Sequence, residues 1–201
     1  MATYTKNKGR LPAAERRAII LARAQELFAE RGYHGVSVEE VANAAGVTKP
    51  VLYDHFRSKE ALFVAVTVQI RDHLLQLSEQ SLPSSGTKSE AISSVVAAFF
   101  VFAEKQPSAI EVLVGAPRAE RKLYRQVQAI QDGATDSLVE MISAIGMLDA
   151  NEVVEPERAR IQVEFIKLGL HALALWRLSR PSLSRAKIVE AVAALVDAGL
   201  R

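Results

Sequence analysis

Cysteine is absent from this 201-residue sequence, which excludes disulfide bonds, thiolate metal sites and cysteine nucleophiles. Long apolar runs are absent too. No segment approaches the roughly 20 consecutive apolar residues of a membrane-spanning helix, and the first residues contain no apolar signal core. The sequence therefore predicts a soluble, cytoplasmic protein that has no membrane partner.

Glycine and proline are scarce, at 10 and 7 residues, and apolar residues recur at spacings of three and four. That period is typical of α-helices, and no segment shows the alternation of a half-buried β-strand. Hydrophobic residues make up 49% of the chain and charged residues 24%, which provides enough apolar side chains for a packed core. We therefore predict a globular, all-α fold.

Sequence signatures of catalysis are also missing. The four histidines, His34, His55, His73 and His171, are scattered, and none has a second ligand at metal-binding spacing. There is no glycine-rich phosphate loop, no G-x-S-x-G motif and no pair of carboxylates in an apolar setting. The sequence predicts a protein that is not an enzyme and that needs no cofactor or metal.

Positive charge is concentrated near the N-terminus, although the formal net charge is only +2. Residues 1–60 contain 10 Lys and Arg against 7 Asp and Glu, whereas the remaining residues contain 15 against 16. In the first 17 residues Glu15 is the single acid, and the bases are Lys6, Lys8, Arg10, Arg16 and Arg17. This end of the chain could meet an anionic polymer, although a solvated tail would have the same charge.

Three short helices are predicted at the N-terminus. The first should span about 12–31, and the second about 37–46, where Ser37 and Glu40 have the spacing of a capping box. A third should begin at Thr48, so close behind the second that the pair predicts a helix-turn-helix. The residues expected to face the core are Ile20, Ala24, Leu27 and Phe28 in the first helix and Val38, Val41, Ala42 and Ala45 in the second. Further helices are expected at about 58–79, 89–105, 107–114, 118–145, 156–179 and 184–199.

The third helix has one face for the core and another for a partner. At 100° per residue, Leu52 and Phe56 stack one turn apart and should hold the helix to its domain. A cation, a rigid ring and a tyrosine on the remaining face suit the major groove of DNA, whereas the alternative is a surface helix that only closes a three-helix core. The residues that point away from the core are Lys49, Pro50, Tyr53 and Asp54.

Residues 15–66 resemble the N-terminal domain of the TetR family of transcription regulators. The motifs that carry the resemblance are AQELFAERGYHGVSVEEVANAAGV, VTKPVLYDHF and RSKEALF. The resemblance implies a DNA-binding helix-turn-helix domain with a basic tail over 1–60, joined by a long helix to a helical effector-binding and dimerisation domain over 61–201. The matching motifs cover about a quarter of the chain. The function it implies is a sequence-specific regulator, most commonly a repressor that a small effector releases from a palindromic double-stranded operator.

The resemblance also implies roles for individual residues. In the family, base edges are commonly faced by the positions of Lys49, Pro50, Val51 and Asp54. Phosphates are commonly contacted by the positions of Ser37, Tyr53, His55 and Lys59. Thr48, the residue at which the recognition helix begins, is also expected to contact DNA. Asp54 has two interpretations: it could accept a hydrogen bond from a cytosine amino group, or it could pair with Lys49 or Arg57 on the surface. Two other functions remain open, namely a helical adaptor and a non-specific DNA-coating protein. As salt rises, a specific regulator keeps its preference for the operator over random DNA, a coating protein loses both affinities together, and an adaptor binds neither DNA.

The C-terminal part contains two unusual apolar segments, VVAAFFVFAEK and RIQVEFIKLGLHALALWRL. In the second, Phe165, Leu168 and Ala172 form an apolar stripe while Lys167 and His171 lie on another, and such polar groups need a partner. By resemblance, the last two helices form a homodimer, for which we expect a stripe of Ile188, Val192, Leu195 and Val196 on the last helix. A mainly apolar effector is expected in a cavity; packing in the core is the alternative role of its predicted wall residues, Phe99, Phe102, Tyr124, His171 and Trp176.

Overall fold

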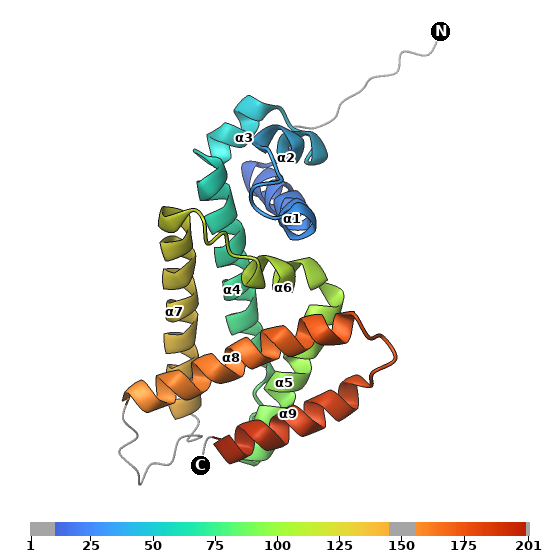
Figure 1. The fold of residues 1–201 in the computed structure, drawn as a ribbon, viewed down its shortest axis with the longest axis vertical. Helices are drawn as coiled ribbons and strands as arrows, with labels where there is room; N and C mark the ends of the chain where they lie inside the picture. Colours follow the sequence, from blue (N-terminus) through green and yellow to red (C-terminus); the bar gives the residue numbers. More distant parts are fainter. Residues whose placement is uncertain (1–10, 145–155, 200–201) are drawn as a thin grey trace.

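The computed structural model describes residues 11–144 and 156–199, and these residues form nine α-helices and no strand (Figure 1). The all-α prediction is confirmed, and the break expected between residues 145 and 156 lies outside the described residues. The helices are α1 (Ala13–Arg31), α2 (Val38–Ala44), α3 (Lys49–His55), α4 (Lys59–Ser81), α5 (Lys88–Lys105), α6 (Pro107–Val114), α7 (Arg121–Ala144), α8 (Pro156–Leu178) and α9 (Arg185–Gly199).

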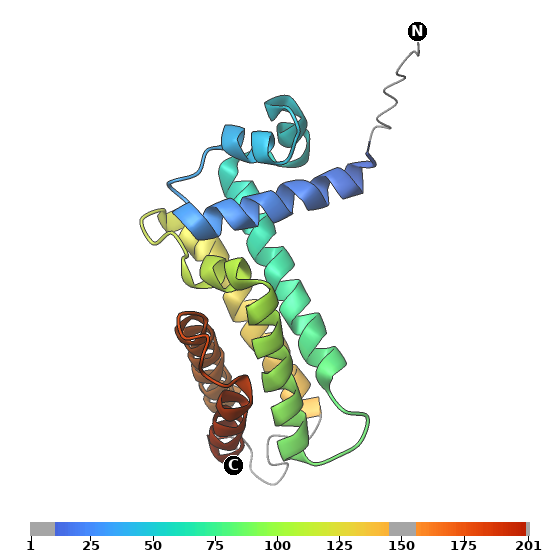
Figure 2. The same ribbon diagram turned by 90° about the vertical axis from the view of Figure 1, so that its right-hand side faces the viewer.

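The first three helices lie together at one end of the molecule, and α4 runs from them toward the other end (Figures 1 and 2). Helices α5 and α7 flank α4, α8 crosses α7 and α6, and α9 packs against α5. Helix α6 lies under α1, so the C-terminal part touches the first helix directly. None of the described helices combines the length and the apolarity that crossing a bilayer requires.

Local capping explains where the helices of the N-terminal part begin. The predicted capping box is present: the Ser37 hydroxyl accepts from the Glu40 N–H at 3.2 Å, and the Glu40 carboxylate accepts from the Ser37 N–H at 2.8 Å. Ser58 caps α4 by accepting from the Ala61 N–H at 3.1 Å. Gly46, with φ of 67°, adopts the left-handed conformation that lets the chain turn sharply between α2 and α3.

The N-terminal core is built from the predicted faces. Ile20, Ala24 and Phe28 are buried, as are Val41 and Ala42, and Leu27, Val38 and Ala45 are partly buried. Phe63 of α4 joins this core because its ring packs edge-on against that of Phe28, with centroids 5.0 Å apart. The buried cluster continues from there into the C-terminal helices.

Candidate DNA interface and effector cavity

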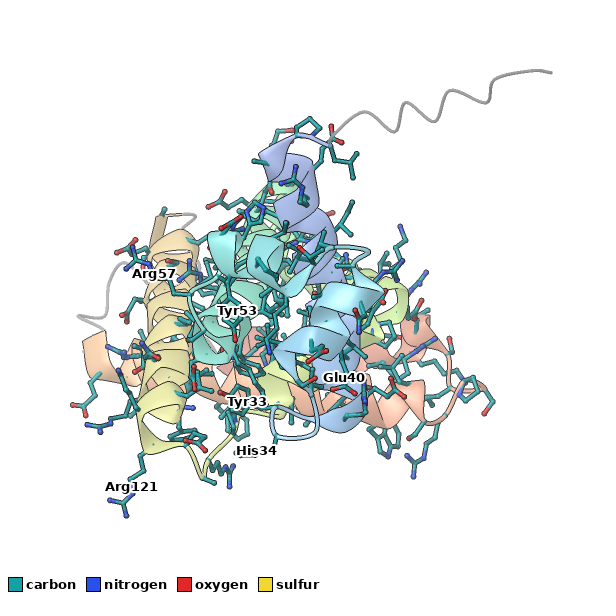
Figure 3. All side chains as sticks on the ribbon, turned by 90° about the horizontal axis from the view of Figure 1, so that it is seen from above. Tyr33, His34, Glu40, Tyr53, Arg57 and Arg121 are labelled. Atoms are coloured by element: carbon teal, nitrogen blue, oxygen red, sulfur yellow. The ribbon has the colours of Figure 1, made fainter. Side chains whose placement is uncertain are left out.

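Helix α3 is anchored by two side chains and leaves its outer face uncovered. Leu52 and Phe56 are almost completely buried, which confirms the predicted inner face. Figure 3 looks onto this end of the molecule, where Tyr53 lies on the surface of α3. Of the residues predicted to contact DNA, Ser37, Thr48, Lys49, Pro50, Tyr53 and Asp54 are exposed, and Val51, His55 and Lys59 are half-buried. All of them lie on α3 or at the adjoining ends of α2 and α4.

The N-terminus of α2 is already occupied by a carboxylate. Hydrogen bonds from the backbone and hydroxyl of Ser37 and from Arg31 lower the pKa of Glu40 to about 2. The Glu40 carboxylate accepts the hydrogen bond of the Ser37 N–H, and the Arg31 guanidinium lies 2.7 Å from the same carboxylate. The backbone N–H of Ser37 is not free for a phosphate, but the N–H groups of Val38 and Glu39 in the first turn have no intrahelical partner.

The cation at the start of α3 has an acidic neighbour on α2. The Lys49 ammonium lies 3.9 Å from the Glu39 carboxylate, and both side chains are more than half exposed. Such a pair is weak, so Lys49 can exchange it for another acceptor at little cost. The alternative pairing of Asp54 with Lys49 or Arg57 is not formed among the described residues, and Asp54 faces solvent.

Three basic side chains lie near the C-terminal end of α3. The Lys59 ammonium lies 4.3 Å from the centre of the Tyr33 ring, and burial lowers the pKa of Lys59. The Arg17 guanidinium lies 5.0 Å from the Phe56 ring and is exposed, as is Arg57 between α3 and α4. The sequence predicted only that the N-terminal bases, Arg17 among them, could meet an anionic polymer; the fold places Arg17 of α1 beside the end of α3. Lys6, Lys8 and Arg10 lie outside the described residues.

An apolar cavity of about 150 Å³ lies between α4, α5, α7 and α8. Most of its wall is aliphatic, from Leu74, Leu77, Leu138, Ile166 and Leu170, and Phe99 and His171 belong to it. Three predicted wall residues do not. Phe102 packs edge-on against His73 one turn beyond Phe99, Tyr124 lies nearly two turns before the nearest α7 wall residue, and Trp176 is 44% exposed under the Arg180 guanidinium.

Helix α8 has apolar side chains on both its inner and its outer face. The inner face includes buried Val163 and Ala174, and among such apolar neighbours Lys167 and His171 are each only 7% exposed. A second apolar stripe faces outward, with Phe165 79% exposed and Ile161, Leu168 and Trp176 also on the surface. Trp176 follows His171 by five residues, which rotates it by about 140° and explains why it cannot reach the cavity. Exposed large apolar side chains that repeat along one helix face are unusual on the surface of a monomer.

Helix α9 contributes to that surface differently from the prediction. Ile188 and Val192 are buried against α5, and Val196 reaches the cavity wall, so these three belong to the core of their own chain. Leu195 alone of the predicted stripe is strongly exposed. Glu104 of α5 holds the two terminal helices together, since its carboxylate lies 2.9 Å from Arg177 and 2.6 Å from Arg185.

Stability should depend on pH through His171. Burial, and then the nearby Lys167 cation, lower the pKa of His171 to about 4 from its ordinary 6.5. Between these values the unfolded chain binds a proton that the folded chain refuses, so stability is complete above pH 6.5 and falls as the pH drops toward 4. Denaturant titrations at pH 7 and pH 5 should show a loss on the order of 2 kcal/mol that His171→Phe removes. Equal losses in both proteins would contradict this prediction.

The geometry at the α3 end is that of a helix-turn-helix DNA-binding protein, and known proteins agree. The family described as "Bacterial regulatory proteins, tetR family" matches residues 20–66. The HTH-type transcriptional activator FasR of Mycolicibacterium smegmatis is 33% identical over 169 residues, which cover 83% of this chain and 74% of FasR. The chain belongs to the TetR family. It is a DNA-binding transcription regulator and not an enzyme.

Solved structures extend the similarity over the whole fold. The fatty acid degradation regulator FadR from Bacillus halodurans has a TM-score of 0.77 at 20% identity, covering 96% of this chain and 99% of that one. FadR from Bacillus subtilis, in complex with stearoyl-CoA, has a TM-score of 0.75 at 19% identity, covering 92% and 99%. At these identities the comparison establishes the shared fold.

Proposed function

We propose that the protein binds a palindromic operator as a homodimer and acts as a repressor that a mainly apolar effector releases from DNA. In this proposal residues 1–60 contact the operator, and residues 61–201 dimerise and bind the effector. The observation that carries it is that an anchored, outward-facing α3 occurs together with an apolar cavity bounded by α4, the helix that follows α3. Selection from random DNA, followed by salt titration against random sequence, tests it: a coating protein would lose both affinities together.

The proposed DNA contacts fall into two kinds. Lys49, Pro50, Val51 and Asp54 would face base edges, where Lys49 can donate to guanine O6 and N7. The phosphate contacts would come from the α2 N-terminus at Ser37, through the N–H groups that follow it, and from Thr48, Tyr53, His55 and Lys59, and we add Arg17 and Arg57 to them. The Thr48 hydroxyl makes no capping hydrogen bond, which leaves it available to a phosphate.

The two kinds of contact should respond differently to substitution. Lys49→Ala should weaken binding at the selected operator by about 1 to 3 kcal/mol and relax the preference at one base position, because a base-edge hydrogen bond is lost. Lys59→Ala should weaken all sequences alike and lower the salt slope by about one, because a phosphate contact is lost. Titrations of both variants on operator and random DNA measure this. An equal loss on the two DNAs for Lys49→Ala would remove its role as a base reader.

Dimerisation is supported by the outward stripe of α8. Ile161, Phe165, Leu168 and Trp176 recur at helical spacing and form an apolar stripe that a second copy would bury, and Leu195 of α9 is exposed as well. Two-fold symmetry would place two recognition helices one helical turn of DNA apart or more, which matches a palindromic site.

Effector control is supported by the size of the cavity. About 150 Å³ is enough for a benzene-sized group but not for a larger ligand, so an acyl chain like that bound by the FadR relative would have to part the surrounding helices. Helix α4 forms one wall of the cavity and begins beside α3. If the helices around the cavity moved apart, α4 would shift and would reposition the recognition helix α3. This linkage requires that the effector prefer the DNA-incompetent arrangement.

Activation is a second candidate, which the name of FasR favours. Repression and activation both follow from operator binding, because the sign depends on where the operator lies relative to the promoter. Transcription measured in vitro from the selected operator, with and without the protein, separates them.

A further inference from the structure

Helix α8 directs two polar groups of different character toward the cavity. Lys167 and His171 are one turn apart, and both belong to the wall. Each is more than nine-tenths buried, so its polar atoms depend mainly on partners within the protein or on a molecule in the cavity. Their hydrogen bonding decides which effectors the cavity accepts.

Lys167 is fully engaged by its own chain. Its ammonium lies 2.9 Å from the Gln131 carbonyl, 2.6 Å from the Thr135 hydroxyl and 2.7 Å from the Glu164 carboxylate. These three acceptors use its three donors, and the Thr135 hydroxyl in turn donates to Glu164. The network is closed, and its cation is already neutralised.

His171 is not engaged in this way. Throughout the described part of the chain no group makes a hydrogen bond with its imidazole, whose ring centre lies 5.8 Å from that of Phe99. Burial and the neighbouring Lys167 cation keep its pKa well below 7, so the ring is neutral. A neutral imidazole has one N–H donor and one acceptor nitrogen.

We propose that His171 is the polar anchor of the effector and that it selects an apolar molecule bearing an uncharged oxygen, such as an ester or thioester carbonyl or a hydroxyl, over a free carboxylate. The inference rests on the proposed effector cavity and specifies its ligand. A carboxylate would gain little from Lys167, whose donors are taken, and it would lie close to the Glu164 carboxylate, which repels it. A carbonyl or hydroxyl oxygen meets the unpaired imidazole without displacing any contact.

Matched probes of equal chain length test the inference. We expect methyl decanoate and 1-decanol to bind the full-length protein more tightly than decanoate at pH 7.5, measured by isothermal titration calorimetry. His171→Phe should weaken methyl decanoate roughly five- to tenfold through one lost hydrogen bond, and His171→Gln, which keeps a donor and an acceptor, should restore most of the affinity. The imidazole ¹⁵N resonances of His171, assigned by their loss in His171→Phe, should shift when methyl decanoate binds.

The outcomes separate this inference from the proposed function. Tighter binding of decanoate, or unchanged affinity of methyl decanoate for His171→Phe, would overturn the inference and leave the effector cavity intact. If no probe binds the wild-type protein, the proposed effector role of the cavity is refuted and the inference with it. Operator binding and thermal unfolding of His171→Phe verify that the variant is folded, and His171→Gln supplies the test if it is not.

Discussion

Phe165→Glu should convert the proposed dimer into a monomer and abolish stable operator binding. The Phe165 side chain is 79% exposed at the centre of the outward stripe of α8, so the folded chain loses nothing when it becomes polar. In a dimer the stripe is buried, and an aromatic interface anchor commonly contributes 2 kcal/mol or more. A two-fold dimer contains Phe165 twice, so the two losses add. The dissociation constant of the dimer should therefore rise by about three orders of magnitude.

Sedimentation equilibrium at micromolar concentration measures this effect, and thermal unfolding verifies that the monomer is folded. Ile19→Glu is the matched control, since Ile19 is an exposed apolar residue of α1 that lies outside the stripe. That variant should remain dimeric. A dimeric Phe165→Glu protein would show that another surface holds the two copies together.

Glu164→Ala should destabilise the fold by about 3 to 5 kcal/mol, because it leaves the Lys167 ammonium buried without a counter-ion. Burial alone would raise the pKa of Glu164, but hydrogen bonds from Lys167 and Thr135 outweigh it and hold that pKa below its ordinary value. The reverse change should be milder. Lys167→Met leaves Glu164 with a side chain 38% exposed, so water can solvate the freed carboxylate.

Denaturant unfolding of the two single variants and of the double variant measures the asymmetry and the coupling. The double variant should be more stable than Glu164→Ala alone, since no unpaired charge remains inside. Arg160→Ala is a control from the same helix, because Arg160 and Asp136 form a pair that is about half exposed and should matter little. Equal losses for Glu164→Ala and Lys167→Met would contradict the closed-network description.

The features that sequence predicted well depend on neighbours along the chain. The capping box of Ser37 and Glu40 needs only a spacing of three, and the burial of Leu52 and Phe56 follows from the helical period. The same logic placed the ends of the nine helices of the described residues within a few residues of those observed. Capping and helical periodicity depend only on residues that are close in sequence, so they can be predicted without knowledge of the fold.

The C-terminal predictions that differ from the structure depend on which helices meet. Phe102 and Trp176 were expected at the cavity wall, yet the Phe102 ring packs against His73 and Trp176 faces out. Of the stripe predicted on α9, Ile188 and Val192 pack inside their own chain because α5 is adjacent to them, and Leu195 is exposed. Phe99, Phe100 and Phe102 are all buried, which one helical face cannot explain, because α5 contacts α4, α6, α8 and α9.

By itself, therefore, the sequence determined the all-α class, the helix-turn-helix and the anchored face of α3, since each arises from local periodicity and capping. The tertiary structure decided that Lys167 lies inside while Phe165 lies outside on the same helix. A buried ammonium is costly unless it is paired, and here Lys167 finds the Gln131 carbonyl and the Thr135 hydroxyl of α7 in addition to Glu164, one turn away on α8. The spacing within α8 encodes the Glu164 pair, but the two partners on α7 come from more than 30 residues earlier in the chain, and only the fold brings them to Lys167.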